Sequence, residues 1–126
     1  MFSDDEQKVV DNARDAMGKR ADFFNEAAKR HPKHAKEFSA LAEATRDMAQ
    51  LSYAEKPDSA LSRRVADQYG PNLKTLLIAS ARDSSLMDEL KNSQEVVMRE
   101  MDDFYAANPS LVPVRDALQK KLNGPK

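Results

Sequence analysis

The feature of this sequence that most constrains its fold is the spacing of the apolar residues, which recur every three or four positions along most of the chain. That spacing places them on one side of an α-helix, which has about 3.6 residues per turn. No stretch alternates apolar and polar residues between turn signals, as a half-buried β-strand does. The sequence therefore predicts an all-α fold.

Proline and capping residues divide this pattern into helices. Ser3 and Glu6 have capping-box spacing, and His31-Pro32 and Asn108-Pro109 each end one helix and open the next. Ser85 and Asp88 again have capping-box spacing. The predicted helices cover residues 3–29, 32–55, 58–82, 84–107 and 109–122, the third with a kink or short break at Gly70-Pro71.

Amphipathic helices joined by short loops satisfy their apolar faces by packing together, so we expect one antiparallel bundle of four, or up to five, helices over residues 1–126. Residues 3–55 form a first hairpin, 58–82 a connecting helical segment and 84–123 a second hairpin. Asp22-Phe23-Phe24 before the first X-Pro junction resembles Asp103-Phe104-Tyr105 before the second. This internal similarity indicates either two hairpins related by a pseudo-twofold axis or a coincidence that arises because X-Pro is common at helix starts.

The charge balance excludes several classes of partner. The chain has 20 Lys and Arg against 21 Asp and Glu, and neither half is strongly basic or acidic, so we expect no nucleic-acid partner and no membrane surface. It has no cysteine, which excludes disulfides and thiolate metal sites. The acidic start Met1-Phe2-Ser3-Asp4 does not resemble a secretory signal, and no apolar run is long enough to cross a bilayer, so a cytoplasmic location is expected.

Two runs of residues carry a resemblance to a known family. The pattern of residues 21–28 and 38–43 resembles the first hairpin of ferritin-like bundles. The pattern of residues 94–95, 104–107, 109 and 114–118 is similar to the second hairpin of small bacterial ferritin-like proteins of unknown function. The resemblance covers most of the chain outside residues 55–82 and implies a ferritin-like arrangement of the helices.

The metal site of that superfamily is not retained. Its members place a Glu on each of two helices and a Glu-x-x-His on each of the other two. At the matching places, Glu43 is followed by Arg46 and Glu95 by Met98, so both histidines are missing. Helix geometry turns Glu26, Glu43 and Glu95 roughly 130 to 155° away from the centres of their apolar stripes. We therefore expect no metal and no other cofactor.

No catalytic constellation is recognisable either. His31 and His34 are the only histidines, and lysines flank them, so we interpret them as exposed loop residues rather than as metal ligands. The sequence contains no Gly-x-Ser-x-Gly elbow and no glycine-rich phosphate loop. We assign no catalytic residues, and an enzymatic activity is disfavoured.

Three polar residues fall on or near the apolar stripes: Arg20, Thr45 and Gln94. They are compatible with a small-molecule pocket or a buried network. We favour a simpler interpretation, in which the arginine head reaches water, the threonine bonds to its own helix and the glutamine fixes helix register. The methionines on the stripes fit core filling better than a binding groove; they are Met17, Met48, Met87 and Met101.

One segment has more apolar surface than a single core contact requires. Residues 73, 76, 77 and 78 cover a wide arc of their helix, so they either form an interaction surface or are completely buried; they are Leu73, Leu76, Leu77 and Ile78. We therefore expect a non-enzymatic bundle that binds another protein or forms a homo-oligomer. The alternatives are a ferritin-like metal-binding or redox protein and a carrier of a small apolar ligand.

Overall fold

The computed structural model describes residues 2–54, 56 and 58–123, and this part of the chain contains helices and turns but no β-strand. The elements in chain order are α1 (Asp4–Arg30), the 3₁₀-helix η1 (Pro32–His34), α2 (Ala35–Leu51), α3 (Ser59–Ala79), α4 (Ser84–Ala107), the 3₁₀-helix η2 (Pro109–Leu111) and α5 (Val112–Asn123). The predicted all-α bundle is confirmed. The second helix ends earlier than residue 55, at Leu51.

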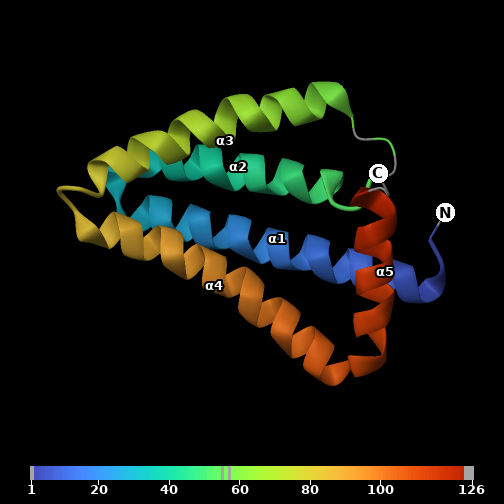
Figure 1. Cartoon of the computed structure of the whole chain (residues 1–126). Helices are drawn as coiled ribbons and strands as arrows, with labels where there is room; N and C mark the ends of the chain where they lie inside the picture. Colours follow the sequence, from blue (N-terminus) through green and yellow to red (C-terminus); the bar gives the residue numbers. More distant parts are fainter. Residues whose placement is uncertain (1, 55, 57, 124–126) are drawn as a thin grey trace.

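The four long helices run up, down, up and down, and α1 lies at the centre (Figure 1). Helix α1 packs along α2 on one side and α4 on the other, and α3 packs along α2. Helices α3 and α4 meet near the turn that joins them and then diverge (Figure 1). Helix α5 crosses the N-terminal half of α1 (Figure 1).

This arrangement differs from the predicted pair of hairpins. Residues 84–123 do not form an antiparallel pair, because α5 packs against α1 and η2 instead of running back along α4. Residues 58–82 are more than a connection, because α3 lies along α2 as a full member of the bundle. Only residues 52–58 separate α2 from α3, whereas ferritin-like bundles have one long crossover connection. The ferritin-like arrangement is thus not confirmed.

The two X-Pro junctions share their local geometry but send the next helix in different directions. His31 has φ −127° and ψ 74°, Asn108 has φ −133° and ψ 61°, and a three-residue 3₁₀-helix comes after each. Beyond the first junction α2 returns along α1, whereas beyond the second α5 turns away from α4. The side chain of Asn108 donates to the carbonyl of Phe104 (2.9 Å), so it caps the end of α4 and not the start of α5. The two segments therefore share a turn geometry but are not related by a pseudo-twofold axis.

Side chains satisfy the free amides at the helix starts. Ser3 Oγ accepts from the Glu6 amide (3.1 Å), and the Glu6 carboxylate accepts from the Ser3 amide (2.9 Å), which confirms the predicted capping box. The predicted box at Ser85 and Asp88 is wrong. Asp83 caps α4 instead, since its carboxylate accepts from the Ser85 amide (3.0 Å) and from the Ser85 hydroxyl.

Helix α3 continues through Gly70-Pro71, so the short break expected there is absent. Proline removes one backbone donor from the helix. Polar side chains bond to neighbouring carbonyls in this region: Asn72 Nδ2 donates to the Gln68 carbonyl (2.7 Å) and the Thr75 hydroxyl donates to the Pro71 carbonyl (3.0 Å). Neither carbonyl is the one that Pro71 leaves without its usual donor, which is that of Asp67, four residues earlier.

Two separate apolar clusters form the core. The first joins the ends of the four long helices near the α3–α4 turn and consists of Ala21, Phe24, Ala27, Phe38, Leu41, Ala42, Leu76 and Leu86. The second joins the start of α1 to the end of α4 and to α5, and consists of Val9, Val10, Tyr105, Leu111 and Leu118. The four stripe methionines, Met17, Met48, Met87 and Met101, are all half-buried, as core-filling residues at the edge of a cluster are.

Burial is uneven among the four long helices. Helix α3 buries only Val65 and Leu76, and α4 buries only two apolar side chains, Leu86 and Tyr105. Their remaining stripe residues are partly exposed: Leu61, Tyr69, Leu73, Leu90, Val97 and Met101. A compact monomer of 14.1 kDa exposes about 6,700 Å², whereas this chain exposes 7980 Å². The chain thus exposes more surface than a compact monomer of its mass, and α3 and α4 bury fewer apolar side chains than α1 and α2 do.

Candidate functional site

The candidate interaction surface on α3 divides into a buried and an exposed half. Leu76 is fully buried in the first core cluster and Leu73 packs against that cluster, so neither is available to a partner. Leu77 and Ile78 face outward and are 44% and 66% exposed. Leu73, Leu76 and Leu77 fall within about 100° of one another around the helix, and Ile78 lies about 100° beyond Leu77, so Leu77 is at the edge of the inward face and Ile78 points away from it. We call Leu77 and Ile78 the α3 surface.

The surroundings of the α3 surface are poor in charge. Residues 68–81 carry a single charged side chain, Lys74, although 33% of the whole chain is charged. Depletion of charge is typical of the centre of a protein–protein interface. The third large exposed apolar residue, Met98 on α4 (54% exposed), has the charged neighbours Glu95, Arg99 and Asp102. Among the large exposed apolar side chains of the described residues, only Leu77 and Ile78 have few charged neighbours along their helix.

The carboxylates that a ferritin-type metal site would use are at the surface. Glu26, Glu43 and Glu95 are all exposed, as their positions on the helices indicate. In the part of the chain that the structure describes, no three His, Asp or Glu side chains come together in a way that could hold a metal ion.

The two histidines are less exposed than expected. The His31 ring lies 5.7 Å from the Phe38 ring, measured between centroids, and its Nε2 is 3.2 Å from Glu89 Oε2. His34 is half-buried as well. The interpretation of both as exposed loop residues is wrong, because the His31 ring lies against Phe38 of the first core cluster and His34 is half-buried.

Glu89 is a site residue that the pattern of the sequence did not indicate. It is 8% exposed and accepts from Arg30 Nε (2.7 Å) and Arg30 Nη2 (3.1 Å) in a two-pronged bond. This hydrogen bond raises the pKa of Arg30 above its usual value. The partners are 59 residues apart in sequence, so no local spacing relates them.

A cavity of about 330 Å³ adjoins this ion pair. Its lining residues are Arg30, His31, Pro32, Lys33, His34 and Asp83. Hydrogen bonds from Ser85, together with nearby His31 and His34, hold the pKa of Asp83 below its usual value. Basic side chains outnumber the single carboxylate of Asp83 in this lining, and one of them, Arg30, is already paired with Glu89.

Arg20 lies between three helices, near the place where α3 and α4 diverge. Its Nη2 donates to the Tyr69 hydroxyl on α3 (3.0 Å) and its Nε to the Ser93 hydroxyl on α4 (3.4 Å). The guanidinium carbon is 5.2 Å from the centre of the Phe24 ring and 5.9 Å from that of Tyr69. Arg20 is therefore part of an interior network, and the simpler interpretation of a head that merely reaches water is wrong.

The polar residue that α4 contributes to this network is not the expected one. Gln94 is exposed, whereas its neighbour Ser93 is fully buried and donates to the Leu90 carbonyl (2.7 Å). The predicted position, Gln94, is one residue beyond the buried one, which corresponds to about 100° around the helix.

Thr45 on α2 is completely buried, and its hydroxyl has no hydrogen-bond partner among the described residues. The expected bond to its own helix is absent. Its neighbour Arg46 pairs with Asp22 on α1. The hydrogen bonds of the described residues join Arg20 to Tyr69 and Ser93 but not to Thr45. We call Arg20, Tyr69 and Ser93 the polar network.

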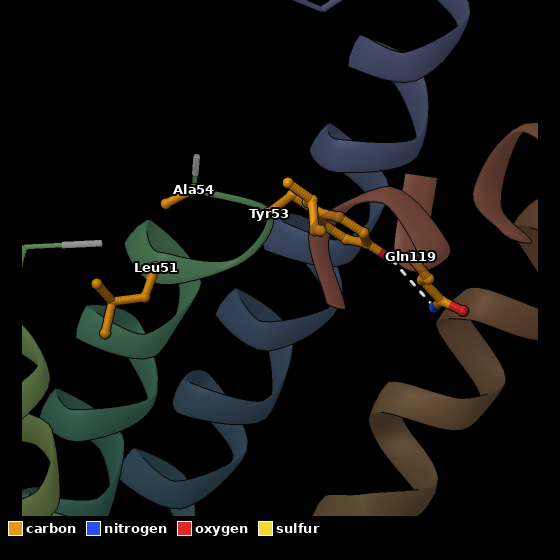
Figure 2. Close-up of a pocket in the computed structure, with 5 residues that line it drawn as sticks. Leu51, Tyr53, Ala54 and Gln119 are labelled. Atoms are coloured by element: carbon orange, nitrogen blue, oxygen red, sulfur yellow. Dashed lines mark hydrogen bonds between the residues drawn. The ribbon is translucent and has the colours of Figure 1, made fainter. Parts of the chain in front are cut away.

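A second cavity lies at the opposite end, where α5 meets the end of α2 (Figure 2). It measures about 390 Å³ and is lined by Leu51, Tyr53, Ala54, Gln119 and Leu122. Tyr53 has φ 58°, an uncommon backbone conformation for a residue other than glycine, and its hydroxyl accepts from Gln119 Nε2 (3.3 Å; Figure 2). The polar groups of this cavity are bonded to each other, so it offers no free charge to a ligand.

Comparisons with known protein families, with curated proteins and with solved structures find no match for this chain. Within the described helices, none is both long enough and apolar enough to cross a bilayer. The candidate sites must therefore be judged on their own geometry.

Proposed function

We propose that this protein is a non-enzymatic helical bundle that self-associates through the α3 surface. The observation that carries the proposal is the exposure of Leu77 and Ile78 on a helix segment that has only one charged residue between positions 68 and 81. Two adjacent aliphatic side chains in such surroundings gain free energy when they leave water, and few charges have to be desolvated with them.

The surface area of the chain supports a protein partner. It exceeds the area of a compact monomer of this mass by about 1,300 Å², given the 7980 Å² that the chain exposes. A stable interface takes about 800 Å² from each partner. Because the side chains of Leu77 and Ile78 are exposed, we expect the contact to lie on α3.

The net charge of the chain favours a second copy of itself as the partner at the α3 surface. The net charge is −1, so two copies repel each other only weakly at long range. In a twofold dimer the same patch lies on both sides of the contact. Two α3 helices that cross at Ile78 would bury Ile78 against its own copy. Lys74 lies one turn away on the same face, and its flexible stem lets the charged group reach water at the edge of the contact.

Sedimentation measurements over a wide range of protein concentrations test this proposal. The wild-type chain should form a dimer, and Ile78→Asp should shift it to the monomer because a buried, unpaired carboxylate would lie at the centre of the contact. Met98→Asp is the matched control, since it places the same charge at the exposed apolar residue of α4. It should leave the dimer intact.

A wild-type chain that stays monomeric at every concentration would overturn the proposal, as would an Ile78→Asp variant that still dimerises. Circular dichroism of both variants checks that the helices remain folded. Because Ile78 is 66% exposed, its replacement should cost the monomer little stability.

A further inference from the structure

We propose that α5 is a lid that opens and closes over the second core cluster while α1 to α4 stay folded, and that Tyr53 holds this lid closed. The lid lies at the opposite end of the bundle from the α3–α4 turn and the α3 surface (Figure 1). The inference therefore does not depend on the proposed self-association.

The division of the core into two clusters allows α5 to leave on its own. Among the described residues, those of the first cluster all come from α1, α2, α3 and α4. Only the second cluster contains a residue of α5, Leu118, which is 1% exposed. Removal of α5 would take Leu118 away from Val9 and Val10 but would leave the packing around Phe24 in place.

Few contacts hold α5 to the rest of the chain. Of the α5 side chains whose burial the structure describes, only Leu118 is buried. The guanidinium carbon of Arg115 lies 4.7 Å from the centre of the Tyr105 ring, and Gln119 donates to Tyr53. A helix of 12 residues is only marginally stable alone in water. Because segments with few buried apolar contacts open most easily in a native protein, α5 should open before the other helices do.

Tyr53 connects the end of α2 to this lid. Its φ of 58° is uncommon for a bulky residue, and such a conformation persists only where the surrounding contacts compensate for its cost. The contacts present here are the packing of the ring against the second cluster and the hydrogen bond that the hydroxyl accepts from Gln119 Nε2 (3.3 Å; Figure 2). Opening of α5 breaks that bond and part of that packing, so the backbone of Tyr53 is then free to return to a negative φ.

Hydrogen exchange of the full chain, followed residue by residue by NMR, tests the inference. Relative to their intrinsic rates, the amides of α5 should exchange about a hundredfold or more faster than those around Phe24, because they need only the opening of the lid. Low concentrations of urea should accelerate exchange in α5 only slightly, since the opening of a lid exposes little surface.

A substitution in the four-helix body distinguishes lid opening from global unfolding. Ala42 is 2% exposed in the first cluster, and α2 is folded whether the lid is closed or open. Ala42→Gly should therefore destabilise both of these states equally relative to the unfolded chain. It should speed exchange around Phe24 about fivefold and leave exchange in α5 unchanged.

Substitutions at Tyr53 should instead favour the open lid. Tyr53→Phe removes only the hydroxyl and should speed exchange in α5 about two- to tenfold, which is the loss expected for one hydrogen bond. Tyr53→Ala also removes the ring and should have a larger effect; if it does not fold, Tyr53→Phe decides the question. Tyr69→Phe is the matched control, because it removes a bonded hydroxyl of the polar network on α3. It should leave exchange in α5 unchanged.

Three outcomes would overturn the inference: α5 amides that exchange as slowly as those around Phe24, equal acceleration of both regions by Ala42→Gly, or unchanged α5 exchange in the Tyr53 variants. None of these readouts involves the contact at Ile78, so failure here leaves the proposed self-association to its own test.

Discussion

The pair α1–α2 and the pair α3–α4 are built from similar amphipathic helices but are covered to very different extents. Seven residues of α1 and five of α2 are buried, against two of α3 and four of α4. Helices α1 and α2 stay in contact along their lengths, whereas α3 and α4 separate after their turn (Figure 1). An apolar stripe determines which face of a helix turns inward, but the path of its neighbours determines how completely that face is covered.

The side chains between the helices are consistent with this difference. The α1–α2 interface contains small residues, such as Ala27 and Ala42, together with the stacked rings of Phe24 and Phe38, 6.3 Å apart. Small residues let two helices approach closely and pack at high density. Between α3 and α4 lies the charged head of Arg20, held by hydroxyl groups rather than by close apolar packing.

The largest effect should come from a cavity in the well-covered pair. Phe38→Ala should lower the free energy of unfolding by about 3 to 5 kcal/mol, because Phe38 is completely buried against Phe24. Val97→Ala in the open pair should cost about 1 kcal/mol or less, because that side chain is half-exposed. Urea unfolding measures both, and similar losses would show that the two pairs are equally well packed.

A smaller effect is expected from the ion pair between Arg30 of α1 and Glu89 of α4, which joins the α1–α2 pair of helices to the α3–α4 pair. Glu89→Gln keeps the shape of the side chain but removes the charge that binds Arg30, so we expect a loss of about 1 to 3 kcal/mol. Glu95→Gln, at an exposed position of the same helix, should change stability by less than about 0.5 kcal/mol. Equal effects of the two variants would mean that the Arg30 bond adds nothing to the α1–α4 contact.

The smallest effect concerns the start of α4 and appears only in acid. The pKa of Asp83 is lower in the folded chain than in the unfolded chain, chiefly because of its hydrogen bonds with Ser85. The contribution of Asp83 to the free energy of unfolding is therefore complete above the pKa of the unfolded chain, about 3.9, and is lost as the pH falls through the lower pKa of the folded chain.

Asp83→Asn should flatten the decline in stability below about pH 4, since asparagine still caps a helix but does not titrate. Thermal unfolding across a pH series measures the slope. Asp88→Asn is the control, because Asp88 is exposed on the same helix and makes no hydrogen bond within the described residues. A slope unchanged by Asp83→Asn would contradict the assigned role of the cap.

Local features of the fold could be predicted from the sequence, and long-range ones could not. The capping box at Ser3 and the junction at His31-Pro32 depend on neighbouring residues, and the structure contains both. The path of α5 depends on which apolar face it meets, and no residue near Asn108 encodes that choice.

The candidate site shows the same limit. Helical spacing placed Arg20 and Thr45 inside the bundle, but it selected Gln94 instead of Ser93, because neighbouring residues differ by only one step around the helix. Spacing also grouped Leu76 with Ile78, although only contact with Leu86 and the rest of the first cluster decides which of them is buried. The bond between Glu89 and Arg30 could not be predicted, since it depends on the path of the chain between them.

The two core clusters also differ in when they can form during synthesis. Every residue of the first cluster has been made once the ribosome reaches Leu86, so the part of the bundle around Phe24 can begin to pack early. The second cluster needs Leu118 to reach Val9 and Val10, close to the opposite end of the chain. Until α5 emerges, the start of α1 remains without its main cover. A nascent chain therefore exposes Val9 and Val10 for longer than it exposes the first cluster.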